Sequence, residues 1–333
     1  MKPRLRSRWL DTALKVVAVL VIVSIVYLGY TIWDAQRQTE QGKLTTRAID
    51  SLVEKVKESP KDPGARILLA QALAAAGRTN EAVEQYQNAL KLDENNPTAL
   101  QGLGLIAMQR EEWTTAEGYW RRILDELTSG QYAGVDERVE QADYYLGLTL
   151  IELHDYEEAV RYLKEAIRIR RDASDTHYAL SIAYRELESK DNQRKELETA
   201  LAFDPLMPEA NYEMALLLLA DGDKAGAAEL LRRAVDNAPG RPEPLAELEK
   251  LGPFADRLAA AKSLLATDKE KALLEARIAI ALKPTDLEAA RIVARLLDEI
   301  GKPEDATAAW ERVIKIAPSD TEASDALARL GKK

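Results

Sequence analysis

Three tyrosines recur at a spacing of 34 residues, and their side chains are suited to binding another polypeptide. They are Tyr144, Tyr178 and Tyr212. A tyrosine ring buries a large apolar area while its hydroxyl donates a hydrogen bond, so tyrosine is frequent among residues that dominate protein interfaces. The equal spacing predicts that the three rings lie on one wall of a repeated structure. The competing interpretation is that they pack between helices as part of the core.

The sequence offers little for catalysis or for binding a metal. It contains no cysteine, which excludes disulfides, thiolate metal sites and cysteine nucleophiles. Its two histidines, His154 and His177, have no metal-ligand spacing around them. The glycines at Gly102 and Gly104 belong to a predicted helix and follow no strand, so they do not form a phosphate loop. We therefore expect no enzyme, with no catalytic residues, no cofactor, no metal and no small-molecule substrate.

Charge is distributed unevenly along the chain. The whole sequence has 46 Lys and Arg against 56 Asp and Glu. Residues 1–33 carry five basic residues and one acidic residue, whereas the other 300 residues carry 41 basic and 55 acidic residues. Because nucleic acid binding requires a basic face, the acidic body predicts no nucleic acid partner.

The elements that hold the three tyrosines are predicted to be pairs of helices with a period of 34 residues. A small residue recurs in the first helix of each pair, and an alanine recurs near the start of the second. Only Gly, Ala or Ser lets two helix backbones approach closely, and proline cannot continue a helix. The small residues of the first helices are Ala70, Gly104, Gly147, Ser181, Ala215, Ala260 and Ala294. The alanines of the second helices are Ala82, Ala116, Ala159, Ala227, Ala272 and Ala306, with Gln193 as the one departure. The prolines that end repeats are Pro205, Pro239, Pro284 and Pro318.

This pattern resembles the tetratricopeptide repeat (TPR) family over residues 47–333. The resemblance implies an all-α fold, a TPR superhelical solenoid of helix pairs. The predicted repeats are 63–96, 97–130, 140–173, 174–207, 208–241, 253–286 and 287–320, with a half repeat before them and a C-terminal capping helix at 321–333. Two insertions, 131–139 and 242–252, interrupt the period and are places where the superhelix can change shape. The second reads PEPLAELEKLG and predicts a short extra helix.

In this family the concave wall, built mainly from the first helices, binds peptides. The resemblance therefore implies a peptide-binding groove with an aromatic and aliphatic strip and a polar edge. Its predicted residues are Tyr144, Tyr178, Tyr212, Leu105, Leu148, Ile182, Leu216 and Arg185. Some members instead hold the C-terminal carboxylate of a chaperone with Lys and Asn side chains. The first two repeats offer Ile67, Gln71 and Gln101 at those positions, so this clamp is not expected.

The N-terminus is predicted to anchor the chain in a membrane. Residues 16–33 read VVAVLVIVSIVYLGYTIW, without a charged residue. As a helix this segment reaches about 27 Å, close to the thickness of a bilayer's hydrocarbon core. The aromatic residues Tyr27, Tyr30 and Trp33 lie at its far end, as expected at the lipid headgroups. The alternatives are a buried core helix and a cleaved signal peptide, which is disfavoured because no A-x-A cleavage pattern follows.

These observations predict a basic cytoplasmic tail at 1–15, a transmembrane helix at 16–33 and a spacer at 34–46. Since basic flanks stay in the cytoplasm, the repeats of this single-pass protein are expected outside it, in the cell envelope. The chain is then a membrane-anchored adaptor or scaffold that binds other proteins or peptide segments. Similar bacterial envelope proteins imply protein complex assembly, secretion or cytochrome maturation. The alternatives are a structural subunit of a fixed membrane complex, or a cytoplasm-facing adaptor if the topology is reversed.

Overall fold

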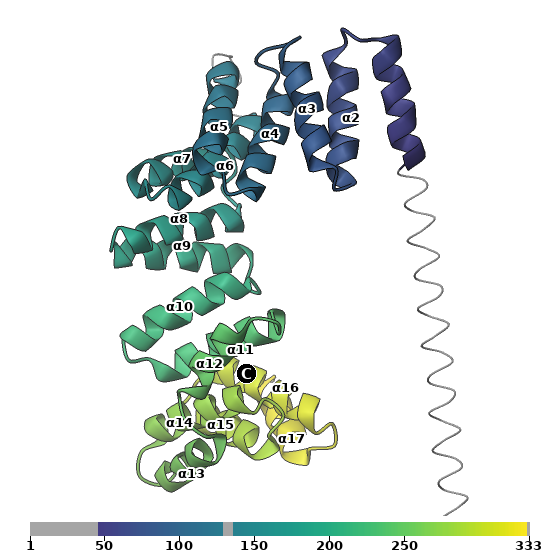
Figure 1. The fold of residues 1–333 in the computed structure, drawn as a ribbon. Coiled ribbons are helices and arrows are strands. Elements are labelled where there is room, and N and C mark those ends of the chain that lie inside the picture. Colours follow the sequence, from purple (N-terminus) through teal and green to yellow (C-terminus); the bar gives the residue numbers. More distant parts are fainter. Residues whose placement is uncertain (1–45, 129–135, 332–333) are drawn as a thin grey trace, which may run out of the picture. The chain divides into compact units, whose positions relative to one another are not determined.

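A computed structural model describes residues 46–128 and 136–331, and these residues form helices and turns without a strand (Figure 1). The all-α prediction is confirmed. The predicted tail and transmembrane helix, nearly all of the spacer, and part of the first insertion lie outside the described residues. No helix within those residues is both long and apolar enough to cross a membrane.

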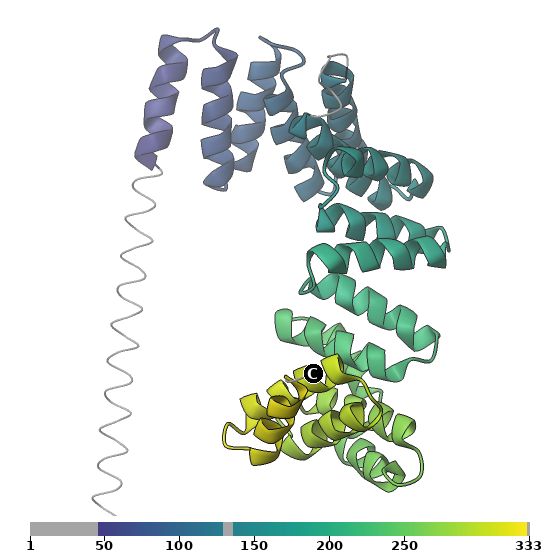
Figure 2. The ribbon, with the colours of Figure 1, turned by 180° about the vertical axis from the view of Figure 1, so that it is seen from behind.

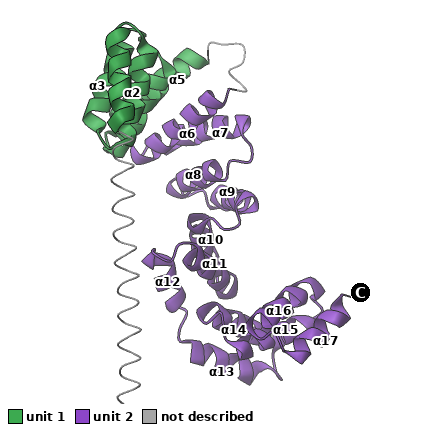
Figure 3. Ribbon diagram, turned by 90° about the vertical axis from the view of Figure 1, so that its right-hand side faces the viewer, with its two compact units in different colours: residues 1–129 green, residues 130–333 purple. Residues whose placement is uncertain are grey.

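The chain divides into two compact units, residues 1–129 and 130–333, which Figure 3 colours separately. In the first unit a helix covers residues 46–58. It is followed by α2 (Pro63–Ala75), α3 (Thr79–Leu90), α4 (Pro97–Gln109) and α5 (Trp113–Leu127). Helix α2 packs on α3, α3 on α4 and α4 on α5. The first unit is therefore a stack of helix pairs.

The second unit is also built of packed helix pairs (Figure 2). Its helices are α6 (Glu137–Glu152), α7 (Tyr156–Ile169), α8 (Ser174–Glu186), α9 (Lys190–Phe203), α10 (Pro208–Ala220), α11 (Lys224–Asn237), α12 (Pro242–Glu249), α13 (Phe254–Leu264), α14 (Lys269–Leu282), α15 (Leu287–Glu299), α16 (Pro303–Ile316) and α17 (Thr321–Leu330). Most helices pack against their sequence neighbours, as α6 does on α7 and α7 on α8. The predicted solenoid of helix pairs is confirmed.

Small residues sit where the two helices of a pair cross. A methyl group added at Gly104 would lie 2.8 Å from the Trp120 ring, and one added at Gly147 would lie 2.5 Å from Leu163. These crossings are too close for a larger side chain. The prediction of Ala260 is wrong for the sixth pair: Ala261 is fully buried there, whereas Ala260 is only half-buried.

The turn inside every pair except the sixth, α13 with α14, uses a left-handed residue at the same place in the repeat. These residues are Gly77, Glu111, His154, Glu188, Gly222 and Gly301. Their φ angles are positive, between 55° and 87°. A non-glycine residue in this conformation costs on the order of 1 kcal/mol. This backbone conformation reverses the chain between the two helices. In the third pair, His154 is the residue that adopts it.

The insertion at 242–252 changes which helix follows α11. It forms α12, and α11 then packs on both α12 and α14. Ile278 and Ala281 of α14 lie in one core cluster with Ala228 and Leu231 of α11. In the earlier pairs the first helix of the next pair takes this position, as α8 does beside α7. The sixth pair therefore joins the stack through its second helix.

Candidate functional site

The tyrosine row, defined as Tyr144, Tyr178 and Tyr212, lies on the first helices of three successive pairs in the second unit. These helices are α6, α8 and α10, and all three side chains are half-buried. Each ring packs toward a later element of the stack. Tyr144 contacts the cluster that contains Leu180, and Tyr178 contacts the cluster that contains Met214. The rings therefore combine packing with an exposed portion.

The hydroxyl groups of the tyrosine row form no hydrogen bond within the described residues, and none of them is fully buried. Burial raises the pKa of Tyr144 and Tyr178 to about 12, and it also raises the pKa of Tyr212. All three hydroxyls are thus protonated at neutral pH. They are available as hydrogen-bond donors and acceptors for a bound molecule.

Aliphatic side chains extend this surface along the same helices. Leu148, Ile182 and Leu216 each follow a tyrosine by four residues, which is about one helical turn. All three are half-buried. Each helix therefore presents an aromatic and an aliphatic side chain on one face. Leu105 belongs to α4 in the first unit, where 40% of its surface is exposed.

A carboxylate row accompanies the tyrosines, and the sequence analysis missed it. It consists of Asp175, Glu209 and Glu243, which are also 34 residues apart. Burial is the largest cause of the raised pKa of each tyrosine. The negative charge of nearby carboxylates raises the pKa further, and at each of the three tyrosines one of these carboxylates belongs to the carboxylate row. The spacing of these acids was visible in the sequence. Their contribution to the tyrosine surface needed the structure, because each acid lies two helices after its tyrosine, on α8, α10 or α12.

The arginines near this surface are already paired with carboxylates. Arg185 lies 2.5 Å from Glu213 and 2.9 Å from Glu186. Arg241 lies 2.6 Å from Glu209, and Arg170 lies 3.5 Å from Asp175. The predicted polar edge at Arg185 is thus engaged within the protein. Two members of the carboxylate row, Asp175 and Glu209, are thus engaged in ion pairs as well.

His177, near the start of α8, contacts a side chain of α9 and the backbone before α8. Its Nδ1 atom lies 2.7 Å from a carboxylate oxygen of Glu196, and its Nε2 atom lies 3.0 Å from the carbonyl oxygen of Arg171. Both partners accept hydrogen bonds, so the two contacts are hydrogen bonds at the same time only when both ring nitrogens carry a proton. Burial acts to lower the pKa of His177, but the bonds to Glu196 and Arg171 outweigh it and the pKa is raised. Over residues 46–128 and 136–331 no group of three His, Asp or Glu side chains is placed to hold a metal ion.

Three family profiles match separate parts of the chain. One described as "TPR repeat" covers residues 70–109. Two described as "Tetratricopeptide repeat" cover residues 145–176 and 179–242. The matches fall in both compact units. All three profiles describe the repeat, and none describes an enzyme family.

Three curated proteins are similar to parts of this chain, at identities of 24%, 25% and 27%. Cellulose synthase operon protein C of Xanthomonas axonopodis pv. citri (strain 306) is 24% identical over 303 residues, which cover 83% of this chain and 18% of the relative. Cellulose synthase 1 operon protein C of Komagataeibacter xylinus is 27% identical over 161 residues, covering 47% of this chain and 12% of the relative. The E3 ubiquitin-protein ligase CHIP of Arabidopsis thaliana is 25% identical over 124 residues, covering 37% and 41%. This chain spans less than a fifth of either cellulose synthase operon protein.

Two solved structures are similar to parts of this chain. The crystal structure of YrrB, described as a TPR protein with an unusual peptide-binding site, is 21% identical, has a TM-score of 0.49, and matches 60% of this chain and 98% of its own. The crystal structure of MamA is 19% identical, has a TM-score of 0.45, and matches 53% and 97%. The identification of the repeats rests on the three family profiles.

Proposed function

Since this chain is a tetratricopeptide repeat protein, we propose that it is a membrane-anchored adaptor or scaffold whose second unit binds positively charged segments of other proteins. The observation that carries the proposal is the tyrosine row, whose hydroxyls have no partner among the described residues and lie beside a row of carboxylates. Half-buried rings with free hydroxyls supply apolar contact and hydrogen bonds together.

The carboxylate row favours a cationic partner. Residues 34–333 carry 41 basic and 55 acidic residues, so the body as a whole attracts positive charge. The arginines that pair with the row, Arg170 and Arg241, are about 50% and 39% exposed. Exposed ion pairs of this kind contribute about 0 to 1 kcal/mol, so a lysine or arginine of a partner competes with them at little cost.

The apolar segment at 16–33 supports a single-pass anchor, and the basic residues before it support repeats outside the cytoplasm. In that compartment the adaptor acts in protein complex assembly, secretion or cytochrome maturation. The likeness to two cellulose synthase operon proteins adds the assembly of a polymer synthase to these roles. The alternatives are a structural subunit of a fixed membrane complex, or a cytoplasm-facing adaptor with reversed topology.

Site-specific photocrosslinking in membranes tests the adaptor. A benzoylphenylalanine at Leu216 places the reactive group beside the tyrosine row, and one at the exposed Lys195 of α9 provides the control. We expect partner adducts from position 216 that decrease at high salt and in a Tyr144, Tyr178, Tyr212 triple alanine variant. Equal adducts from both positions, or adducts indifferent to the tyrosines, count against this surface. A stable oligomer of residues 47–333 that buries the tyrosine row favours the structural subunit.

A further inference from the structure

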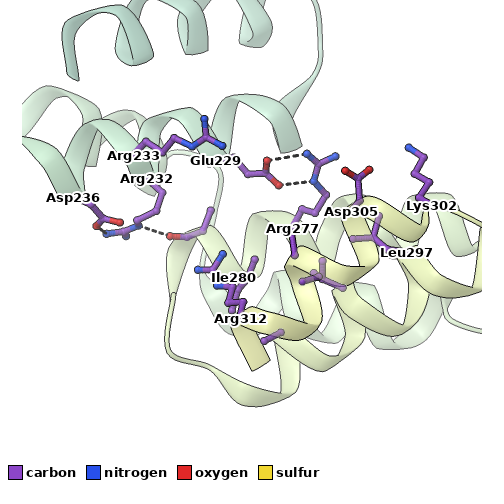
Figure 4. A pocket seen from close by; sticks show the side chains of 15 residues that line it. Glu229, Arg232, Arg233, Asp236, Arg277, Ile280, Leu297, Lys302, Asp305 and Arg312 are labelled. Carbon is purple, nitrogen blue, oxygen red and sulfur yellow. Dashed lines mark hydrogen bonds and ion pairs between the residues drawn. The ribbon is translucent and has the colours of Figure 1, made fainter. Parts of the chain in front are cut away.

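A pocket of about 450 Å³ lies among α11, α14, α15 and α16, on helices that the tyrosine row does not use (Figure 4). It exists because α14 packs on α11, which brings the second helices of the fifth, sixth and seventh pairs together. Part of its lining is apolar and includes Ile280, Val293 and Leu297. The rest is charged, with arginine side chains predominating. Its volume falls within the range of small-ligand sites, about 300 to 1,000 Å³.

Four of the eight charged side chains that line this pocket are paired with one another. Arg277 and Glu229 form two bonds, of 2.6 and 2.9 Å, drawn as dashed lines in Figure 4. Arg232 donates a 2.7 Å hydrogen bond to the carbonyl oxygen of Ala281 and lies 3.2 Å from Asp236. These groups form a fixed wall. Because these side chains already have partners, they offer few hydrogen-bonding groups to a ligand.

Arg312 differs from Arg232 and Arg277, which have carboxylate partners, and from Arg233, which is exposed. Its half-buried guanidinium has no carboxylate within ion-pair distance among the described residues, and its one hydrogen bond is a 3.4 Å contact from Nη2 to the carbonyl oxygen of Pro284. Burial lowers the pKa of Arg312, but arginine remains charged in proteins. Glu229 and Asp236 act on this partly buried charge only from beyond ion-pair distance, so an anion that reached Arg312 would be stabilised.

We propose that this pocket binds a carboxylate attached to a short aliphatic group, with Arg312 holding the carboxylate and Ile280, Val293 and Leu297 receiving the aliphatic part. The planar guanidinium matches a carboxylate with two parallel hydrogen bonds. Glu229, Asp236 and Asp305 also line the pocket, and they repel a phosphate dianion more strongly than a carboxylate with a single charge. The C-terminal residue of a peptide and a free short-chain acid share this chemistry. The proposal does not depend on the tyrosine row.

The test measures ligand binding to the full chain in detergent by saturation-transfer NMR. The probes are acetyl-Gly-Gly-Val with a free C-terminus, the same peptide as its C-terminal amide, isovalerate and inorganic phosphate. We expect the peptide acid to bind at least about tenfold more tightly than the amide, because the amide cannot form the charge-assisted pair. Binding of the peptide acid but not isovalerate identifies a peptide terminus as the source, and comparable binding of both identifies the carboxylate group alone.

Two variants test the assignment of the pocket. Arg312→Gln is expected to weaken binding of the peptide acid about tenfold, while Lys315→Gln removes the same charge from an exposed position of α16 outside the pocket and leaves binding unchanged. Ala308→Leu keeps every charge and fills the pocket, so it abolishes binding even if Arg312→Gln proves unstable. Absence of binding by the acid, equal binding of the amide or phosphate, or full binding by both pocket variants overturns the proposal.

Discussion

Glu229 in α11 and Arg277 in α14 form a bidentate ion pair between helices whose paired residues are 48 positions apart in the sequence. Both side chains are about two-thirds buried, with 37% and 35% of their surfaces exposed. The pair joins the fifth helix pair to the second helix of the sixth. It therefore marks the place where the packing order of the solenoid changes.

A double-mutant cycle with Glu229→Gln and Arg277→Gln measures what this pair contributes. We expect a coupling free energy of about 1 kcal/mol, at the upper end for ion pairs with partial solvent access. The measurement is denaturant unfolding of the four proteins. The pair of Arg161 with Glu158, which lies within α7 and whose arginine is 60% exposed, is the control and should couple by about 0.5 kcal/mol or less. Equal coupling in the two cycles would remove the special role of the α11 and α14 contact.

Two glycines of the first unit should respond in opposite directions to alanine. Gly104→Ala places a methyl group 2.8 Å from the Trp120 ring and should destabilise the unit by about 1 to 3 kcal/mol. Gly118 lies in α5 with open space around it, so Gly118→Ala should stabilise by about 0.5 to 1 kcal/mol. Thermal unfolding of both variants checks the pair. Destabilisation by both substitutions would contradict the close crossing at Gly104.

The sequence predicted the repeats because each one obeys the same local rules. Gly104 and Gly147 indicate where the two helices of their pairs cross, because only small residues fit there. The position of α14 on α11 was not predictable from periodicity, which locates helices but does not say how a chain continues after an inserted helix. The error at Ala260 has the same origin. Helix α13 follows the insertion, and Ala261 is its one buried residue.

The candidate site was predicted in part for a related reason. The 34-residue spacing of Tyr144, Tyr178 and Tyr212 identified one face of the first helices. It did not reveal that the carboxylate row stands beside them, because those acids belong to the following elements of the stack. Nor did the sequence indicate that Arg185 pairs with Glu213, which requires α8 and α10 to be neighbours.

The stability of the second unit should fall as the pH rises through neutrality. Asp143 is buried in α6, and burial together with the nearby charge of Glu165 raises its pKa to about 7. The unfolded carboxyl has a pKa of about 3.9, so between these values the folded state binds more protons and the unfolding free energy decreases with pH. Asp143→Asn should remove this decrease. It should stabilise the protein on the order of 2 kcal/mol more at pH 8 than at pH 5.

His177 contributes in the same direction, because its pKa is raised in the folded state. Its stabilisation is present at pH values below its unfolded pKa of about 6.5 and is lost as the pH rises through the folded value. The control for Asp143→Asn is therefore His177→Gln, which should keep the part of the pH dependence due to Asp143. Urea unfolding at a series of pH values separates the two. Parallel curves for the wild type and Asp143→Asn would show that Asp143 does not titrate in this range.

Removal of residues 1–45 should release the protein from membranes, because the apolar segment at 16–33 is then absent. In the full chain, protease added outside spheroplasts should digest the repeats. Fractionation and immunoblotting provide both readouts. Protection of the repeats until lysis would reverse the orientation and favour the cytoplasm-facing adaptor.

The tyrosine row should determine binding more than stability. Replacement of Tyr144, Tyr178 and Tyr212 with Phe keeps the rings and removes only the free hydroxyls, so melting should change little while partner affinity falls. Ala215→Leu is the opposite control. Ala215 is fully buried in α10, and the added bulk should destabilise by about 1 to 3 kcal/mol regardless of what the surface binds.

The most direct measurement is the affinity of the triple alanine variant for the partner segment recovered by crosslinking at Leu216, determined by calorimetry alongside its thermal unfolding. If the row binds that segment, affinity should fall strongly, since interface hot spots cost about 2 kcal/mol or more each and do not add simply. The helical content should be retained. If the tyrosines serve only the core, the loss should appear as stability, at about 3 to 5 kcal/mol for an emptied aromatic site. A variant that melts as early as Ala215→Leu yet binds the segment with unchanged affinity in its folded fraction would contradict the proposed function.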